Sequence, residues 1–285
     1  MYLREWYRSV LEQTDQDYHL WIGMDGIDAE DVKKTMGADP NAIWVMAASG
    51  DTPAQIRQRA LAQIIEAYDG VVLVDSDDML HASRVNAARA ALQLSDLAGC
   101  ALRLVDQRGH DLRSTFSLPL QSRPEDVFPR NNIFGLSNSA FRSDLLRTCL
   151  PIPAEVVLVD WFLATKAWLY GARMVFDPVV RMDYRQHGSN MARVRPPFSL
   201  NQVVRDTERV RQHFQILLTA QKKDFIDDRL AELEQVACDV EMFYQNVILQ
   251  PAQLEHYIQA LNELNPAPLW WSCVAHPSLR QIWMQ

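Results

Sequence analysis

A short apolar run that stops on a cluster of carboxylates constrains this chain more than any other feature. Residues 71–74 (Val-Val-Leu-Val) follow Gly70 and lead directly into Asp75, Asp77 and Asp78. Such a run is typical of a strand covered on both faces of a parallel sheet, and ligands of open α/β sheets gather at the carboxyl ends of these strands. If the strand continues, Asp75 and Asp77 lie on the same side of it. Two carboxylates so placed can hold Mg²⁺ or Mn²⁺ and leave positions open for phosphate oxygens.

A second interpretation of the same cluster is an Asp-rich loop that caps the helix expected to begin near Ser83. Spacing alone does not separate the two interpretations, so the surrounding chain has to decide.

Composition sets the class of the protein. The 285 residues fit one large domain, or one domain with an appendage. The formal charge of −8 argues against a nucleic-acid partner, which would require a basic face. The four cysteines show no CxxC spacing, which disfavours a zinc site or a disulfide framework. No segment approaches the ~20 apolar residues that span a bilayer, and no signal peptide is visible. We therefore expect a cytoplasmic protein, either free or peripheral at the inner membrane face.

Strands and helices alternate over the first part of the chain. Apolar residues recur at helical spacing at the amino terminus, short apolar segments indicate strands, and Asp51-Thr52-Pro53 is typical of a helix start. This alternation predicts an α/β fold with a doubly wound, mostly parallel sheet. The predicted elements are a helix near 3–11, strands at 20–24 and 43–47, a helix at 53–68, a strand at 71–74, a helix at 84–94 and a strand at 100–105.

Two later segments of the chain depart from this alternation of strands and helices. Asp106–Pro129 is rich in Gly, Pro, Ser and Arg, and we expect loops at the mouth of a cleft. A short helix from Ser143, a helix over 158–170 and a strand over 173–176 follow. From Asn201 onward the pattern is helical throughout. The sequence therefore predicts two parts, residues 1–195 and a helical carboxyl-terminal region at 196–285, with Pro196-Pro197 as the linker candidate.

Several segments, in the right order, resemble motifs of the family 2 glycosyltransferases, which have the GT-A fold. Residues 2–14 resemble the helix after that family's first strand, and Leu20–Gly26 resembles its second strand with an acidic turn. Residues 74–78 resemble its metal-binding DxD motif, Asp160-Trp161 the pair that includes the catalytic base, and residues 184–190 a segment that closes over the donor diphosphate. Each motif alone is weak, but their order makes the resemblance specific.

The resemblance implies a nucleotide-sugar-binding catalytic domain over 1–195 and a metal-assisted donor site. Asp77, with Asp75, would hold the Mg²⁺ or Mn²⁺ that offsets charge on the leaving diphosphate. His187 would add a ligand to this ion or a hydrogen bond to the phosphates, and Arg185 offers a planar fork for phosphate oxygens. Arg57 lies where the family commonly has a basic residue near the phosphates. For His187 and Arg57 the alternative is an ordinary solvent-exposed side chain.

Asp160 is the expected catalytic base, because a carboxylate near an acceptor hydroxyl can take its proton as it attacks the anomeric carbon. The alternative is that Asp160 only favours a helix amino terminus, by ~0.3–1 kcal/mol. The family often has a second acid just before the base, where this chain has Val159. The resemblance assigns Asp25 to the nucleotide, and Asn138 and Trp161 to the donor sugar or acceptor. An ordinary Asp-Gly turn and core packing are the alternatives for Asp25 and Trp161.

One departure from the family lies at the amino terminus. The family opens with an apolar strand and a Pro-x-Tyr-Asn-like turn, which this sequence lacks. Loss of that strand would expose the edges of its neighbours and remove part of the base pocket. Either the sequence begins too late, or another segment or a partner chain completes the sheet, or the protein is a degenerate binding or assembly protein. The last explanation predicts that Asp25, Asp77 and Asp160 face solvent without forming one cleft.

The resemblance thus predicts an inverting, metal-dependent glycosyltransferase. It would move a sugar from a nucleotide-sugar, by preference a UDP-sugar, to a saccharide or lipid-linked acceptor in bacterial surface-polysaccharide synthesis. Three roles are compatible with Trp270-Trp271 and Trp283: core packing, a homo-oligomeric contact between copies of the chain, and contact with a membrane. A sugar nucleotidyltransferase would also use a strand-end acidic cluster, but the chain has no Gly-rich phosphate loop. A glycoside hydrolase would need two opposed carboxyl groups and no metal.

Overall fold

The chain folds into two compact units. The computed structural model describes residues 2–119, 121–188, 190–220 and 224–284. Unit 1 consists of Met1–Thr115, Phe134–Trp168 and Ala172–Gln186, and unit 2 of Phe116–Ile133, Leu169–Gly171 and His187–Gln285. The division predicted at residue 196 differs from this one, because Phe116–Ile133 joins unit 2 and Pro196-Pro197 lies inside it.

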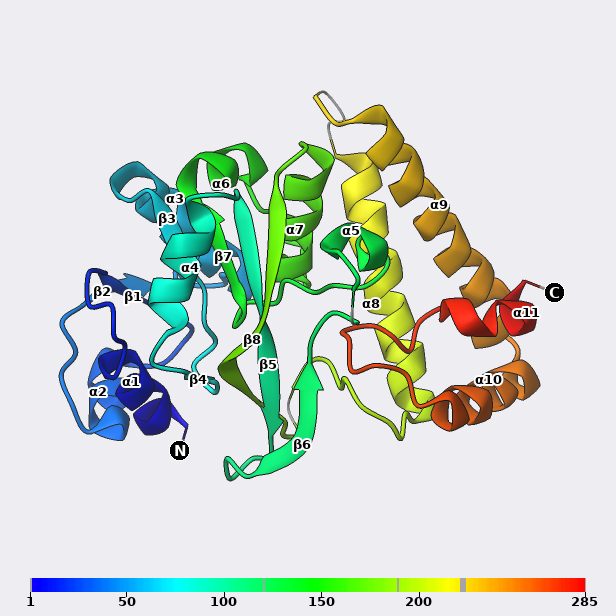
Figure 1. Ribbon diagram of the computed structural model, residues 1–285, viewed down its shortest axis with the longest axis horizontal. Helices are drawn as coiled ribbons and strands as arrows, with labels where there is room; N and C mark the ends of the chain where they lie inside the picture. Colours follow the sequence, from blue (N-terminus) through cyan, green and yellow to red (C-terminus); the bar gives the residue numbers. More distant parts are fainter. Residues whose placement is uncertain (1, 120, 189, 221–223, 285) are drawn as a thin grey trace. The chain divides into compact units, whose positions relative to one another are not determined.

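Unit 1 is an α/β unit, as predicted. Its helices are α1 (Leu3–Leu11), α2 (Ala29–Met36), α3 (Pro53–Ala67), α4 (Arg84–Leu92), α6 (Ser143–Cys149) and α7 (Val159–Leu169). Its strands are β1 (Leu20–Met24), β2 (Ala42–Met46), β3 (Gly70–Val72), β4 (Met79–Leu80), β5 (Leu97–Val105), β6 (Asp111–Phe116), β7 (Ser139–Arg142) and β8 (Met174–Arg185), labelled in Figure 1.

The start of α3 shows how local sequence fixes an element. The Thr52 side chain accepts a hydrogen bond from the Gln55 backbone N–H at 3.4 Å, and the Gln55 side chain accepts one from the Thr52 N–H at 2.8 Å. This reciprocal capping box satisfies two donors that a helix start leaves unpaired, and Pro53 supplies a pre-set φ angle. The helix start predicted from Asp51-Thr52-Pro53 is confirmed.

The strands of unit 1 form two separate sheets. β1 and β2 pair in parallel, with Leu20 opposite Ala42. The larger sheet has the order β3-β7-β5-β8-β4, with β6 attached to β5. β3, β5 and β8 run in one direction, which is the mostly parallel arrangement expected, whereas β7 and β4 are reversed. The sequence did not indicate these short reversed strands.

The core of unit 1 lies between the large sheet and its helices. Every residue of β5 except Arg103 is buried, and α7 is apolar almost all round, which is the pattern of a buried helix. The loop expected over Asp106–Pro129 is wrong for Asp111–Phe116, which forms β6, because alternating polar residues hid a half-exposed edge strand. The strand expected at 173–176 continues to Arg185 as β8.

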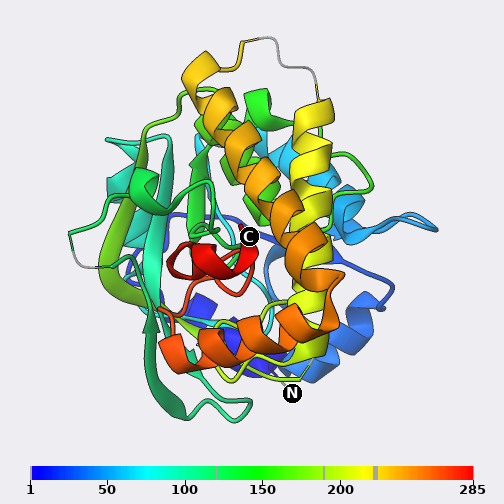
Figure 2. The ribbon, with the colours of Figure 1, turned by 90° about the vertical axis from the view of Figure 1, so that its right-hand side faces the viewer.

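Unit 2 is helical. It contains α5 (Pro124–Val127), α8 (Leu200–Thr219), α9 (Asp227–Phe243), a π-helical turn η1 (Tyr244–Ile248), α10 (Pro251–Leu264), a 3₁₀ turn η2 (Pro277–Leu279) and α11 (Arg280–Trp283). Figure 2 shows α8 and α9 side by side, with α10 across their ends. Trp270, Trp271 and Trp283 are buried in this unit, as core packing requires. Among the described residues, no helix is long and apolar enough to cross a membrane.

Candidate functional site at the carboxyl end of β3

The acidic turn after β3 is held by a network of hydrogen bonds. Asp78 is 1% exposed, and its carboxylate accepts the Arg185 backbone N–H at 2.7 Å and the Ser137 hydroxyl. The same hydroxyl accepts the Asp75 backbone N–H at 3.1 Å. Burial, followed by the charge of Asp77, raises the pKa of Asp78 well above its usual range. Asp78 is therefore the structural acid of the cluster.

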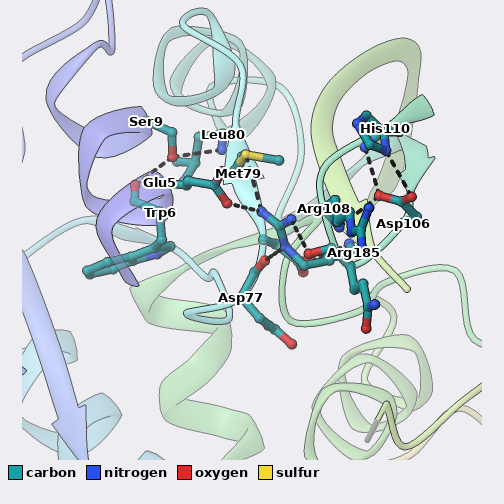
Figure 3. Close-up of polar contacts among 12 residues, drawn as sticks. Glu5, Trp6, Ser9, Asp77, Met79, Leu80, Asp106, Arg108, His110 and Arg185 are labelled. Carbon is teal, nitrogen blue, oxygen red and sulfur yellow. Dashed lines mark hydrogen bonds and ion pairs between the residues drawn. The ribbon is translucent and has the colours of Figure 1, made fainter. Parts of the chain in front are cut away.

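Arg185 holds the same turn from the other side. Its side chain has no exposed surface, and it donates to the Asp77 backbone carbonyl at 2.8 Å, to the Gln107 carbonyl at 3.2 Å and to Glu5 Oε2 at 2.7 Å (Figure 3). Its guanidinium also lies 4.6 Å from the centre of the Tyr2 ring. A phosphate contact by Arg185 stays a prediction, and it would require the guanidinium to leave these partners.

Asp75 and Arg57 form the accessible part of the site. The Arg57 guanidinium lies 3.5 Å from Asp75 Oδ1, with side chains 36% and 41% exposed. Partial removal from water raises the pKa of Asp75, and the charge of Asp77 adds to this, whereas Arg57 opposes it. Asp77 lies two residues after Asp75, in the turn that follows β3.

Asp160 lies in the first turn of α7. Removal from water raises its pKa to about 6. The Trp161 backbone N–H opposes this shift, the charge of Asp75 adds to it, and Arg57 opposes it. Asp160 thus interacts electrostatically with both Asp75 and Arg57, although these residues lie far apart in the sequence. A carboxyl group with a pKa of about 6 can both accept and release a proton near neutral pH.

Unit 1 contains a cavity of about 1230 Å³, which is lined by residues of the site and by a further acidic residue. Asp25, Arg57 and Asp75 all line it. Asp25 follows β1 and is exposed, so its carboxylate is open to a ligand. Asp25, after β1, and Asp75, after β3, therefore border the same cavity. Their roles in binding a donor stay predictions.

Three other predicted site residues have different surroundings. Asn138 and Trp161 are completely buried, and Asn138 Nδ2 donates to the Cys100 carbonyl at 2.8 Å. Neither side chain is open to a sugar in this structure, and their ligand contacts stay predictions. His187 belongs to unit 2, where its backbone N–H donates to Asn190 Oδ1 at 2.5 Å. Sequence reasoning missed Ser137, although it lies in the segment singled out for Asn138.

The acidic pair fits an incomplete metal site. Within residues 2–119, 121–188, 190–220 and 224–284, no group of three or more His, Cys, Asp or Glu side chains is placed to hold an ion. Asp75 and Asp77 nevertheless belong to one short acidic turn, and Asp75 is partly exposed. Mg²⁺ and Mn²⁺ are commonly bound by one or two carboxylates plus water and substrate phosphates. The two carboxylates therefore suit an ion whose remaining ligands come with the substrate.

Comparison with solved structures shows that the fold is similar to that of known glycosyltransferases. TarS 1-349 of S. aureus in complex with UDP-GlcNAc is similar, with a TM-score of 0.54 and 16% identity over 98% of this chain and 88% of that one. A mannosyltransferase of Pyrobaculum calidifontis, PcManGT, in complex with GDP-Man and Mn²⁺, gives a TM-score of 0.57 and 14% identity over 98% and 75% of the chains. A longer TarS structure is covered over only 45% of its length, with a TM-score of 0.55 and 17% identity.

The similarity to these proteins is one of fold, because the sequence comparisons found no matching family or protein. No protein-family description matches this chain, and no curated protein matches it.

Proposed function

We propose that the protein is an inverting glycosyltransferase that moves a sugar from a nucleotide-sugar to a hydroxyl acceptor. The observation that carries this proposal is the ion pair of Arg57 with Asp75, because both side chains also line the cavity. Their charges act on the carboxyl group of Asp160, which supports Asp160 as a proton acceptor for a reaction at a metal-bound diphosphate. The glycosyltransferase fold and the acidic motif after β3 support the same reaction.

Asp160 acts as the general base. Its carboxylate takes the proton of the acceptor hydroxyl while that oxygen bonds to the anomeric carbon, and the bond from this carbon to the diphosphate breaks on the opposite face. The configuration is therefore inverted. A pKa of about 6 keeps most of Asp160 ionised at neutral pH while making it a stronger base than an ordinary aspartate.

The donor lies at the carboxyl ends of β1 and β3. Asp75 and Asp77 would hold a divalent ion, which would supply positive charge to the leaving diphosphate. Arg57 faces the phosphates and Asp25 bonds the base or ribose. The resemblance adds His187 as a further donor-binding residue. Arg185 acts through Asp77, because its bond to the Asp77 carbonyl fixes the turn that presents the carboxylates.

The proposed setting is the cytoplasmic synthesis of a bacterial surface polysaccharide, with a UDP-sugar as donor and a saccharide or lipid-linked acceptor. This assignment rests on the sequence resemblance. GDP-sugars are the second donor class to test, because one structure of the same fold binds GDP-Man.

A degenerate, non-catalytic relative is the alternative. It predicts acidic residues that face solvent without sharing a cleft. Of Asp25, Asp77 and Asp160, for which this was predicted, Asp25 lines the cavity and the other two are not among its lining residues. The charge of Asp75, which does line the cavity, acts on Asp160, and this supports the enzyme.

Calorimetric titration tests the donor site without knowledge of the acceptor. UDP and GDP would each be titrated with and without Mn²⁺ into the native protein, Asp77→Ala and Asp144→Ala. Asp144 is an exposed acid of α6 and serves as the matched control. We expect Mn²⁺-dependent binding that Asp77→Ala weakens at least tenfold and Asp144→Ala leaves unchanged. Equal binding by all three proteins would contradict the metal site.

Transfer is tested separately, by screening labelled UDP- and GDP-sugars against saccharide acceptors. Asp160→Asn should abolish transfer and leave the affinity for UDP within about twofold, since the base acts on the acceptor. Full transfer by this variant would refute the assigned base, even if the donor site is correct.

A further inference from the structure

The acidic turn after β3 is closed by its own backbone. The Asp78 N–H donates to the Asp75 carbonyl at 3.3 Å, so residues 75–78 form a turn with Asp77 inside it. Figure 3 shows the Asp77 side chain directed away from the Arg185 guanidinium, which donates to the Asp77 backbone carbonyl at 2.8 Å. The carboxylates proposed to hold the ion, those of Asp75 and Asp77, therefore belong to one short turn whose backbone determines how both are presented.

Ser137 completes the pairing of β3 with β7 at the point where the two strands separate. In this antiparallel pair the Leu73 N–H donates to the Ser139 carbonyl at 3.1 Å. Hydrogen-bonded pairs recur at every second residue of such strands, so the next donor on this side is the Asp75 N–H, and the residue opposite it is Ser137. The side-chain hydroxyl of Ser137 accepts this donor at 3.1 Å. A side chain thus takes the place of a backbone carbonyl.

The same hydroxyl reaches the last residue of the turn. It donates to the Asp78 carboxylate, whose other oxygen accepts the Arg185 backbone N–H at 2.7 Å. A serine hydroxyl has one donor and two acceptor positions, so it can accept from Asp75 and donate to Asp78 at once. Ser137 is 2% exposed, so its hydroxyl is not open to a ligand and acts only through the turn. It joins the first and last residues of the turn, with Asp77 between them.

We propose that Ser137 is a positioning residue for the divalent ion, and that it sets a preference for a small octahedral ion over a larger one. The proposal rests on the proposed donor site but not on the assignment of Asp160. Mg²⁺ requires nearly ideal octahedral geometry with oxygens at about 2.0–2.1 Å, whereas Ca²⁺ accepts more oxygens at about 2.3–2.6 Å in flexible arrangements. A turn held at both ends suits the first ion. Without the Ser137 hydroxyl the turn can widen, which costs Mg²⁺ more than Ca²⁺.

A purely structural role for Ser137 makes a different prediction. Loss of a buried hydrogen bond would lower the stability of the fold and leave the affinity of the folded protein for both ions unchanged. Ser143 provides the matched control, because it is 3% exposed and its hydroxyl donates to the Tyr68 carbonyl at the end of β7 away from the acidic turn. Ser139 is a second control, since its buried hydroxyl has no hydrogen-bond partner among the described residues.

Calorimetry of the full chain measures the affinity for each ion. Mg²⁺ and Ca²⁺ are titrated separately in the presence of UDP and, in a second series, of GDP, and the heat of ion binding to the nucleotide alone is subtracted. Ser137→Ala should weaken Mg²⁺ binding by roughly 10–100-fold, as is typical when a residue that orients a metal ligand is lost. It should weaken Ca²⁺ binding by less than about threefold, so the ratio of the two affinities falls. Ser139→Ala and Ser143→Ala should leave both affinities unchanged.

A second measurement needs neither the ion nor the nucleotide. Amide hydrogen exchange followed by NMR should show a protected Asp75 N–H in the native protein without metal, and Ser137→Ala should remove this protection. Free exchange of the Asp75 N–H in the native protein would overturn the proposal, and this test holds even if Ser137→Ala does not fold.

The outcomes separate this proposal from the proposed function. If the native protein binds ion and nucleotide and Ser137→Ala binds both ions equally well, Ser137 is not a positioning residue, although the donor site stands. An equal loss of Mg²⁺ and Ca²⁺ affinity would likewise overturn the proposed preference. If the native protein binds neither ion with either nucleotide, the donor site itself is wrong, and the role of Ser137 falls with it.

Discussion

Replacing Asp160 with asparagine should stabilise the free protein at neutral pH while it abolishes sugar transfer. Removal from water raises the pKa of Asp160 from 3.8 to about 6. At pH 7 the folded protein therefore keeps the Asp160 carboxylate charged in surroundings that disfavour the charged form. The asparagine amide has nearly the same shape and carries no charge, so the variant is relieved of this cost.

The sign and size of the effect follow from proton binding. Below pH 3.8 the carboxyl is protonated in both the folded and the unfolded protein, so it contributes no difference. Between pH 3.8 and 6 the unfolded chain releases the proton first, and the stability of the native protein falls as pH rises. Two pKa units correspond to roughly 3 kcal/mol as an upper limit. Because backbone N–H groups favour the carboxylate, we expect a gain of about 1–2 kcal/mol above pH 6.

Urea unfolding followed by circular dichroism, at intervals from pH 4 to 8 with a chelator present, measures this gain. Asp183→Asn is the control of opposite sign. Hydrogen bonds from His81 and Arg103 outweigh burial and lower the pKa of Asp183. This variant should lose stability at neutral pH, and the loss should shrink as the solution becomes acidic. A constant difference between Asp160→Asn and the native protein at every pH would refute the reasoning.

Two further predictions concern the core and the thiols. A Cβ atom at Gly99 would lie 2.9 Å from both Phe134 and Phe176, so Gly99→Ala should lower the free energy of unfolding by roughly 1–3 kcal/mol, and an unchanged urea midpoint would contradict this packing. Of the four cysteines only Cys238 is exposed, so an aromatic disulfide reagent should titrate about one thiol per native chain and all four after unfolding.

Much of the fold could be predicted because its signals are local. Thr52, Pro53 and Gln55 determine the start of α3 within one helical turn, and apolar periodicity located α7 to within a residue or two. The reversed strands β4 and β7 escaped prediction. They are short, and their pairing depends on β8, β3 and β5, which lie far away in the chain.

The site shows the same contrast. The acidic run after residue 74 can be recognised in the sequence, since its chemistry requires carboxylates at the end of a strand. The burial of the Arg185 side chain could not be predicted, because it depends on Glu5 and on the carbonyl groups of Asp77 and Gln107.

The sequence by itself determined the alternating elements, the acidic strand end and the apolar helices of the last part of the chain, because neighbouring residues encode them. Only the tertiary structure decided that Asp78 is buried while Asp75 is partly open, that Asn138 and Trp161 lie inside, and that the charge of Asp75 acts on Asp160. The physical reason is that the exposure and charge environment of a side chain depend on residues distant in sequence, which are brought together only when the chain folds.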